Sequence, residues 1–171
     1  MFIVGCGYIG TRLARQGLGR GERVMGVVRS QMRMASIHKI GVEALQCDLD
    51  CADLPPDCTR DQAVYYCAPP PPKGDCDTRM QRFLAGLDLT GQPRRIVYLS
   101  TTGVYGDCQG AWVDESWPAN PKVDRSRRRW DAEQALHAWR ERSGGEVVML
   151  RAGGMCWRGK LPLERLRQGL P

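Results

Sequence analysis

Three glycines near the start of the chain have the spacing of a phosphate-binding turn. Gly5, Gly7 and Gly10 form the pattern G-x-G-x-x-G directly after the apolar run Phe2–Val4. The first glycine permits a tight turn, the second lets a pyrophosphate approach the backbone, and the third lets a helix pack closely on the strand. The phosphates then meet the N-terminus of that helix. The pattern therefore predicts a dinucleotide-binding turn.

The chain carries an arginine where NAD-selective domains carry an acidic residue. In those domains an Asp or Glu about twenty positions after the turn accepts hydrogen bonds from the ribose hydroxyls. Here Arg29 stands at that point, and Arg33 follows one helical turn later. A guanidinium cannot accept from a 2′-hydroxyl, but it pairs well with a 2′-phosphate. We therefore expect NADP to be preferred over NAD; the alternative is that Arg29 is only a solvated strand end.

Alternating strands and helices would carry these residues. Apolar and β-branched runs predict strands at residues 2–4, 23–28, 42–47, 63–68, 95–100 and 146–150. Helical spacing of apolar residues predicts helices at 9–16, 30–39, 80–87 and 132–139, with a breaker at 17–21. The continuous apolar run at 63–68 predicts a strand covered on both faces. This alternation predicts an α/β fold, a doubly wound parallel sheet of the NAD(P)-binding Rossmann type.

Size and composition predict one globular domain, residues 1–171. The chain has 171 residues, of which 42% are apolar and 26% charged. It has no apolar run long enough for a membrane helix and no signal-peptide pattern, so we expect a cytoplasmic protein. Its eight cysteines include no C-x-x-C pair and only two histidines accompany them, which predicts reduced thiols and no metal site.

The net charge of +6 raises the question of a nucleic-acid partner. The densest basic cluster comprises Arg125, Arg127, Arg128 and Arg129. It is interrupted by Asp124 and Asp131 and has only one neighbouring aromatic residue, so a solvated helix face is the alternative. We favour an anionic cofactor over nucleic acid as the reason for the charge.

An ordered set of segments resembles the extended short-chain dehydrogenases, the NAD-dependent epimerase/dehydratase family. The segments are GCGYIG from Gly5, CDLD from Cys47, YLSTTGVYGD from Tyr98, WVDESWPANP from Trp112 and LRAGGMCWRGKLPLERLRQG from Leu150. By this resemblance Asp48 would face the adenine, and Ala68 and Pro69 would pass the cofactor ribose. Thr101 would take the place of the catalytic hydroxyl, and Tyr105 is the nearby phenol that could substitute as an acid. Residues 155–171 would be the start of a curtailed substrate-binding segment, the substrate subdomain being largely absent.

The chain departs from the family at its Tyr-x-x-x-Lys pair. In the family the lysine depresses the pKa of the tyrosine and holds the nicotinamide ribose. Counting between Pro121 and Glu133 places Arg125 at the tyrosine position and Arg129 at the lysine position. A guanidinium stays protonated, so neither can donate a proton near neutral pH. The chain thus resembles atypical members that lack the pair.

Three functional hypotheses follow. The residues expected around the cofactor are Gly5, Gly7, Tyr8, Ile9, Gly10, Arg29, Asp48, Ala68, Pro69 and Arg129. The first hypothesis is an NADP(H)-dependent oxidoreductase or epimerase of unknown substrate, with Arg125 or Arg129 binding an anionic group on it. The second is a non-catalytic NADP-binding sensor or partner-binding module. The third, nucleic-acid binding, rests on charge alone, and a homo-oligomer is left open.

Overall fold

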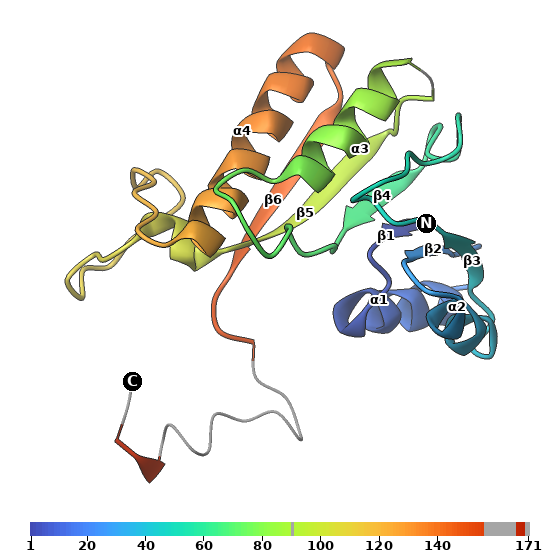
Figure 1. The fold of residues 1–171 in the computed structure, drawn as a ribbon, viewed down its shortest axis with the longest axis horizontal. Helices are drawn as coiled ribbons and strands as arrows, with labels where there is room; N and C mark the ends of the chain where they lie inside the picture. Colours follow the sequence, from blue (N-terminus) through green and yellow to red (C-terminus); the bar gives the residue numbers. More distant parts are fainter. Residues whose placement is uncertain (90, 156–166, 170–171) are drawn as a thin grey trace.

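The structure is a computed structural model that describes residues 1–89, 91–155 and 167–169. Strands and helices alternate along most of the chain (Figure 1). In order they are β1 (Phe2–Val4), α1 (Tyr8–Gly19), β2 (Met25–Val28), α2 (Gln31–His38), β3 (Glu43–Gln46), β4 (Ala63–Tyr66), α3 (Thr78–Leu89), β5 (Arg95–Thr101), the 3-10 helix η1 (Thr102–Tyr105), α4 (Asp124–Ser143) and β6 (Glu146–Ala152).

The strands form one parallel sheet in the order β3-β2-β1-β4-β5-β6. The chain builds outward from β1 through β2 to β3, then crosses back to place β4 on the other side of β1. This confirms the predicted doubly wound Rossmann fold. In such a sheet the crevice at the carboxyl ends of the strands, where the order reverses, is the usual ligand site. Here the reversal lies between β1 and β4.

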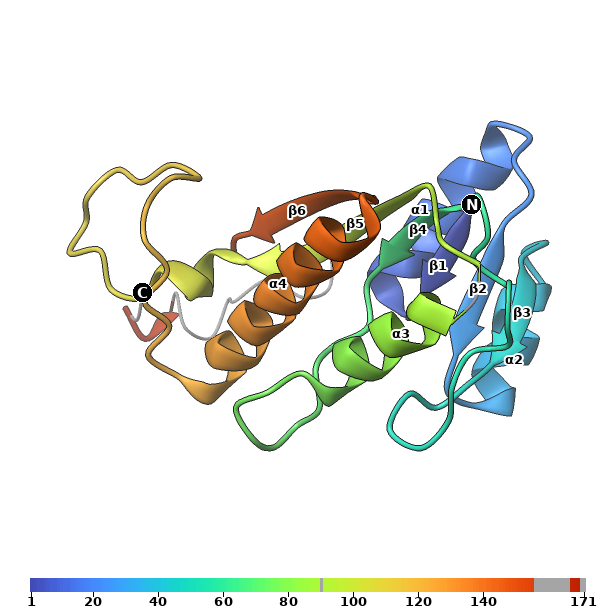
Figure 2. The same ribbon diagram turned by 90° about the horizontal axis from the view of Figure 1, so that it is seen from above.

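Different helices cover the two faces of the sheet. Helices α1 and α2 lie on one face beside β1, β2 and β3, whereas α3 and α4 lie on the other, across β4 and β5 (Figures 1 and 2). Each face has its own apolar core. The predicted stripe of α3 is buried in the larger core: Met80, Phe83, Leu84 and Leu87. Burial of that stripe is the main force that would hold α3 on the sheet.

Two local predictions differ in part from the structure. The breaker does not begin at Gly17, because α1 continues to Gly19 and buries Gly17 against Val24 and Met1. A Cβ at Gly17 would lie 3.0 Å from Val24 Cγ2, so the glycine permits a close helix–strand contact. Strand β4 has a core on both faces, as predicted, but burial is complete on one face only: Val64 and Tyr66 are fully buried, whereas Tyr65 is partly buried against the α1–α2 core.

Neither a membrane span nor a metal cluster is found in the described ranges. No helix there is long and apolar enough to cross a bilayer. No group of three or more His, Cys, Asp and Glu side chains in the same ranges could hold a metal ion. The proposed substrate segment 155–171 lies largely outside the described residues, of which it includes Met155 and 167–169.

Candidate functional site

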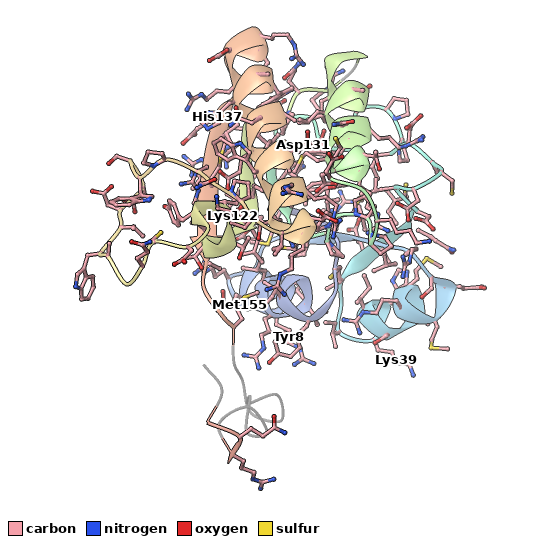
Figure 3. All side chains as sticks on the ribbon, turned by 60° about the vertical axis from the view of Figure 1, so that its left-hand side comes forward. Tyr8, Lys39, Lys122, Asp131, His137 and Met155 are labelled. Atoms are coloured by element: carbon pink, nitrogen blue, oxygen red, sulfur yellow. The ribbon has the colours of Figure 1, made fainter. Side chains whose placement is uncertain are left out.

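A crevice of about 570 Å³ opens at the carboxyl ends of the strands. All ten residues expected around a cofactor line it: Gly5, Gly7, Tyr8, Ile9, Gly10, Arg29, Asp48, Ala68, Pro69 and Arg129. They come from the β1–α1 turn, from the ends of β2, β3 and β4, and from α4. Tyr8 and Met155, both labelled in Figure 3, belong to the same wall. The fold therefore brings together residues that are 150 positions apart in the sequence.

The three glycines of the turn have different structural reasons to be glycine. Gly5 has a φ of +85°, and a Cβ there would lie 2.5 Å from the backbone nitrogen of Ala68. A Cβ on Gly10 would lie 2.7 Å from the carbonyl oxygen of Gly5. A Cβ on Gly7 would meet no atom within 4 Å, although Gly7 lines the crevice. Two glycines thus serve the packing of the turn, whereas the third leaves room for a ligand.

Arg33 crosses from α2 to the glycine turn. Its Nε donates to the carbonyl oxygen of Cys6 at 3.2 Å, and its Nη2 donates to that of Gly7 at 3.1 Å. The Nη2 atom also donates to Thr11 Oγ1 at 2.6 Å. The Ser30 side chain caps α2 by accepting from the Arg33 amide, which fixes the first turn that carries this arginine. A cation is therefore held beside the turn expected to bind phosphate.

The wall of the crevice carries four arginines and one acidic residue. The arginines are Arg29, Arg33, Arg79 and Arg129, and the acid is Asp48. Arg29 is exposed and makes no hydrogen bond or ion pair within the described part of the chain. Asp48 Oδ1 accepts from the Asp50 amide at 3.1 Å, so that oxygen is used in a local turn. The crevice is consequently electropositive, which suits a polyanionic ligand.

Arg79 ties together the loops that follow β3 and β4. Its guanidinium donates to both carboxylate oxygens of Asp50 at 2.6 and 2.5 Å, and to the carbonyl oxygens of Pro69 and Pro70 at 2.9 and 3.3 Å. The hydrogen bonds from Arg79 lower the pKa of Asp50. Because Asp50 follows Asp48 and Pro69 follows Ala68, this arginine fixes the spacing of two walls of the crevice.

Arg129, on α4, reaches β5 from the position at which the sequence resemblance predicts the family's lysine. Its Nη1 donates to the carbonyl oxygen of Leu99 at 2.9 Å and to the Tyr98 hydroxyl at 3.3 Å. Burial raises the pKa of Tyr98 to about 12, so this phenol is protonated at neutral pH. Arg125, one turn earlier on α4, is exposed and does not line the crevice. Of the two arginines in the Tyr-x-x-x-Lys positions, only the second faces the site.

The two candidate catalytic residues lie beside the crevice rather than on its wall. Thr101 ends β5, and its Oγ1 accepts from the Gly103 amide at 3.2 Å. Tyr105 is 8% exposed, and its ring packs under the guanidinium of Arg151 at 4.7 Å. Neither side chain is among the crevice-lining residues. Of these two residues, Thr101 is closer in sequence to a residue that lines the crevice, because it follows Leu99 by two positions.

The arginines near the start of α4 lie in different environments. Arg127 pairs with Asp124 at 3.0 Å on the exposed face. Arg128 is buried and donates to the carbonyl oxygen of Gly74, while Arg129 faces the crevice. The four arginines therefore do not form one continuous exposed stripe.

A buried acid fixes α4 to the sheet beneath the site. Glu133 is fully buried, accepts from Ser100 Oγ at 2.5 Å, and pairs with Arg151 at 2.7 Å. Through Ser100 and Arg151, Glu133 links α4 to both β5 and β6. These contacts therefore fix the position of α4, and with it that of Arg129, relative to the crevice. A buried carboxylate with two such partners is costly to disrupt.

Sequence reasoning missed several wall residues. Arg79 and Cys67 line the crevice but belong to no motif, whereas Cys6 and Cys47 line it from within the GCGYIG and CDLD segments without having been assigned a role. The signal that could have found Arg79 is an arginine directly preceding the first residue of a buried helical stripe, Met80. The guanidinium of such a residue must either reach solvent or pair with an acid, and here it pairs with Asp50.

Comparison with known proteins agrees with this geometry. The family model described as "NAD dependent epimerase/dehydratase family" matches residues 1–156. Protein YeeZ of Escherichia coli K12 is 30% identical over 171 aligned residues, which cover 94% of this chain and 60% of that protein. The chain thus spans about three-fifths of the length of this relative.

Solved structures show the same arrangement. A conserved protein of unknown function from Silicibacter pomeroyi is 30% identical, with a TM-score of 0.72 over 96% of this chain and 56% of that one. The UDP-glucuronic acid 4-epimerase of Bacillus cereus, solved with NAD, has a TM-score of 0.76 at 19% identity, over 99% of this chain and 63% of that one. The second likeness supports the fold alone. From the family match over residues 1–156, the chain belongs to the NAD-dependent epimerase/dehydratase family.

Proposed function

We propose that the crevice binds NADP(H) and that the chain serves an oxidoreductase or epimerase reaction on a small molecule. The observation that carries the proposal is the pair formed by Arg29, directly after β2, and Arg33, in the first turn of α2, neither of which makes an ion pair with an acid among the described residues. An NAD-selective site needs an acceptor for ribose hydroxyls at that place. Two guanidiniums instead suit a 2′-phosphate.

The dimensions and chemistry of the crevice fit a dinucleotide. Its volume of about 570 Å³ lies within the ordinary range for small-molecule sites. The open space at Gly7 and the N-terminus of α1 suit a pyrophosphate, and Asp48 and Ala68 stand on the neighbouring wall. When bound, the nicotinamide would supply hydride transfer. The protein's part would be to orient it, with Arg129 on the crevice wall near the end of β5.

Binding titrations of NADP⁺ and NAD⁺ test the proposal. The wild type, Arg29→Asp and the control Arg20→Asp, at an exposed position outside the crevice, are compared by calorimetry. We expect the wild type and Arg20→Asp to prefer NADP⁺. Arg29→Asp should lose about tenfold to a hundredfold in NADP⁺ affinity, since a charge-assisted hydrogen bond contributes about 1.5–3 kcal/mol. Equal affinities of the wild type for both nucleotides, or an unchanged preference in Arg29→Asp, would refute NADP selectivity.

A second candidate function is a non-catalytic NADP-binding module. It is favoured by Arg125 and Arg129 standing in the positions of the tyrosine and lysine, because a guanidinium cannot give up a proton near neutral pH. Incubation with NADPH and a panel of nucleotide sugars and carbonyl compounds separates the two. A fall in absorbance at 340 nm supports the enzyme, whereas retained NADPH binding without any turnover supports the module.

A further inference from the structure

We propose that the substrate of this site carries a carboxylate or phosphate, and that Arg129 binds it. The inference rests on the proposed function, because it takes the rest of the crevice to be filled by a phosphorylated dinucleotide. Four arginines line the crevice wall, and a bound dinucleotide would leave one of them without an anionic partner.

Three of the four arginines are accounted for. Arg79 is neutralised by Asp50 through two hydrogen bonds of 2.6 and 2.5 Å. Arg29 lies just before α2 and Arg33 lies in its first turn, and because both line the crevice we expect one 2′-phosphate to serve both. The pyrophosphate of a dinucleotide belongs at the glycine turn. No phosphate is left for Arg129.

Arg129 has no carboxylate partner within ion-pair distance in the described ranges. Two acids near this end of α4 hold other hydrogen bonds: Asp77 Oδ1 accepts from the Met80 amide at 3.1 Å, and Asp131 Oδ2 accepts from the Asp77 amide at 2.8 Å. The second oxygen of Asp77 is buried without a hydrogen-bond partner. Burial raises the pKa of Asp77, and the positive charge of Arg129 opposes that rise. The guanidinium of Arg129 thus has no carboxylate bonded directly to it among the described residues, and a partly buried charge of this kind is stabilised by an anionic ligand.

The guanidinium of Arg129 is also pre-organised to bind such a ligand. Its Nη1 is fixed by the Leu99 carbonyl and the Tyr98 hydroxyl, at 2.9 and 3.3 Å, and it packs 5.7 Å from the centre of the Tyr98 ring. No described group accepts from its Nε or Nη2. An arginine anchored at one nitrogen and open at the others binds an oxyanion with little loss of side-chain entropy.

The structure distinguishes Arg129 from Arg125, the other arginine considered for this role. Arg125 is exposed and off the crevice wall, whereas Arg129 shares that wall with Leu99 and Met155. An anion bound at Arg129 would therefore lie inside the crevice beside apolar residues, where charge pairing is stronger than at the exposed surface. Arg125 consequently provides a matched control.

The test is a ¹⁵N NMR titration that follows the arginine Nε–H resonances of protein saturated with NADP⁺. The probes are pyruvate for a carboxylate, inorganic phosphate, and acetone as a neutral compound. The Arg129 resonance is identified by its loss in Arg129→Lys. We expect pyruvate or phosphate, but not acetone, to shift it in a saturable way. The anion that shifts the Arg129 resonance shows whether the charged group of the substrate is a carboxylate or a phosphate.

Variants give an independent readout of affinity. Arg129→Gln should weaken binding of the active probe about tenfold or more, and Arg125→Gln should leave it unchanged. An Arg129 resonance that moves with NADP⁺ but with neither anion would overturn the inference and make Arg129 a cofactor residue only. Anion binding that survives in Arg129→Gln, or disappears in Arg125→Gln, would overturn it as well.

Failure of the proposed function has a different signature. If the wild type binds no NADP⁺ in calorimetry, the cofactor assignment fails. The same anion titration without nucleotide still reports on Arg129 in that case. A saturable shift would then support the anion site by itself, and no shift would refute it.

Discussion

The guanidinium of Arg33, on α2, donates to the carbonyl oxygen of Gly7 at the start of α1, 3.1 Å away. With the bonds to Cys6 and Thr11, it joins two helices across the crevice end of β1 and β2. The residue suited to a 2′-phosphate therefore also sets the shape of the turn suited to the pyrophosphate. The two parts of the proposed cofactor site are mechanically coupled.

This coupling predicts the effect of Arg33→Met. The variant loses the bonds to the turn as well as the charge, so NADP⁺ affinity should fall about tenfold or more, and NAD⁺ affinity should also fall, by a smaller factor. The wild-type Arg29 side chain makes no such bonds, so Arg29→Met should lower the affinity for NADP⁺ but not that for NAD⁺. Calorimetric titration of both variants with both nucleotides checks this. Unchanged NAD⁺ binding in Arg33→Met would contradict the coupling.

Gly5→Ala and Gly7→Ala should have opposite effects on folding and binding. A Cβ at position 5 would lie 2.5 Å from the Ala68 nitrogen and would stand at a φ of +85°, so Gly5→Ala should lose about 2 kcal/mol of unfolding free energy or more. Gly7 has a φ of −80° and open space around it, so Gly7→Ala should fold with nearly wild-type stability. Its new methyl group should nevertheless weaken NADP⁺ binding. Urea unfolding and calorimetry measure the two effects, and a Gly7→Ala variant that binds like the wild type would be the contrary result.

Arg79→Met should affect both cofactors alike. The substitution releases Asp50 and the Pro69 carbonyl, so the walls that follow β3 and β4 lose their common anchor. We expect a loss of about 1.5–3 kcal/mol in stability and weaker binding of NADP⁺ and NAD⁺ by a similar factor. Arg82→Met is the control, because its 3.3 Å pair with Asp53 is exposed and should contribute less than about 1 kcal/mol. Equal stability of the two variants would count against the anchor.

Cys67 should react slowly with iodoacetamide. Burial raises the pKa of this thiol to about 11, so at pH 7.5 it is almost entirely the unreactive neutral form. Its labelling should therefore accelerate as the pH rises towards 11, and NADP⁺ should protect it because it lines the crevice. Peptide mass mapping at pH 7.5 and 9.5, with the exposed Cys51 as internal reference, provides the measurement. Labelling of Cys67 as fast as Cys51 at pH 7.5 would be inconsistent with this environment.

Local patterns in the sequence were sufficient for the fold and for part of the crevice wall. The glycine spacing at Gly5, Gly7 and Gly10 predicted the first strand, turn and helix, and apolar spacing from Met80 to Leu87 predicted the buried face of α3. These features depend on residues a few positions apart, which propensity and periodicity can detect. Boundaries were less accurate where tertiary contact decided them, as at Gly17, which packs against Val24.

The contacts that organise the site could not be predicted in the same way. Arg33 reaches Cys6 over 27 positions, Arg79 reaches Asp50 over 29, and Arg129 reaches Leu99 over 30. Each depends on where parallel strands end relative to one another, and no local pattern specifies that. The same limitation explains why Thr101 could be expected on the wall of the crevice, although its hydroxyl bonds locally to Gly103.

The most direct measurement is the thermal unfolding temperature with and without NADP⁺. A ligand that binds only the folded state at one hundred times its Kd adds about 2.7 kcal/mol of stability. For a domain of this size that corresponds to a rise of roughly 5–11 °C. We predict such a rise with NADP⁺ and a smaller one with NAD⁺ at the same concentration. An unfolding temperature that neither nucleotide changes, at millimolar concentration, would contradict the account of the glycine turn as a dinucleotide site.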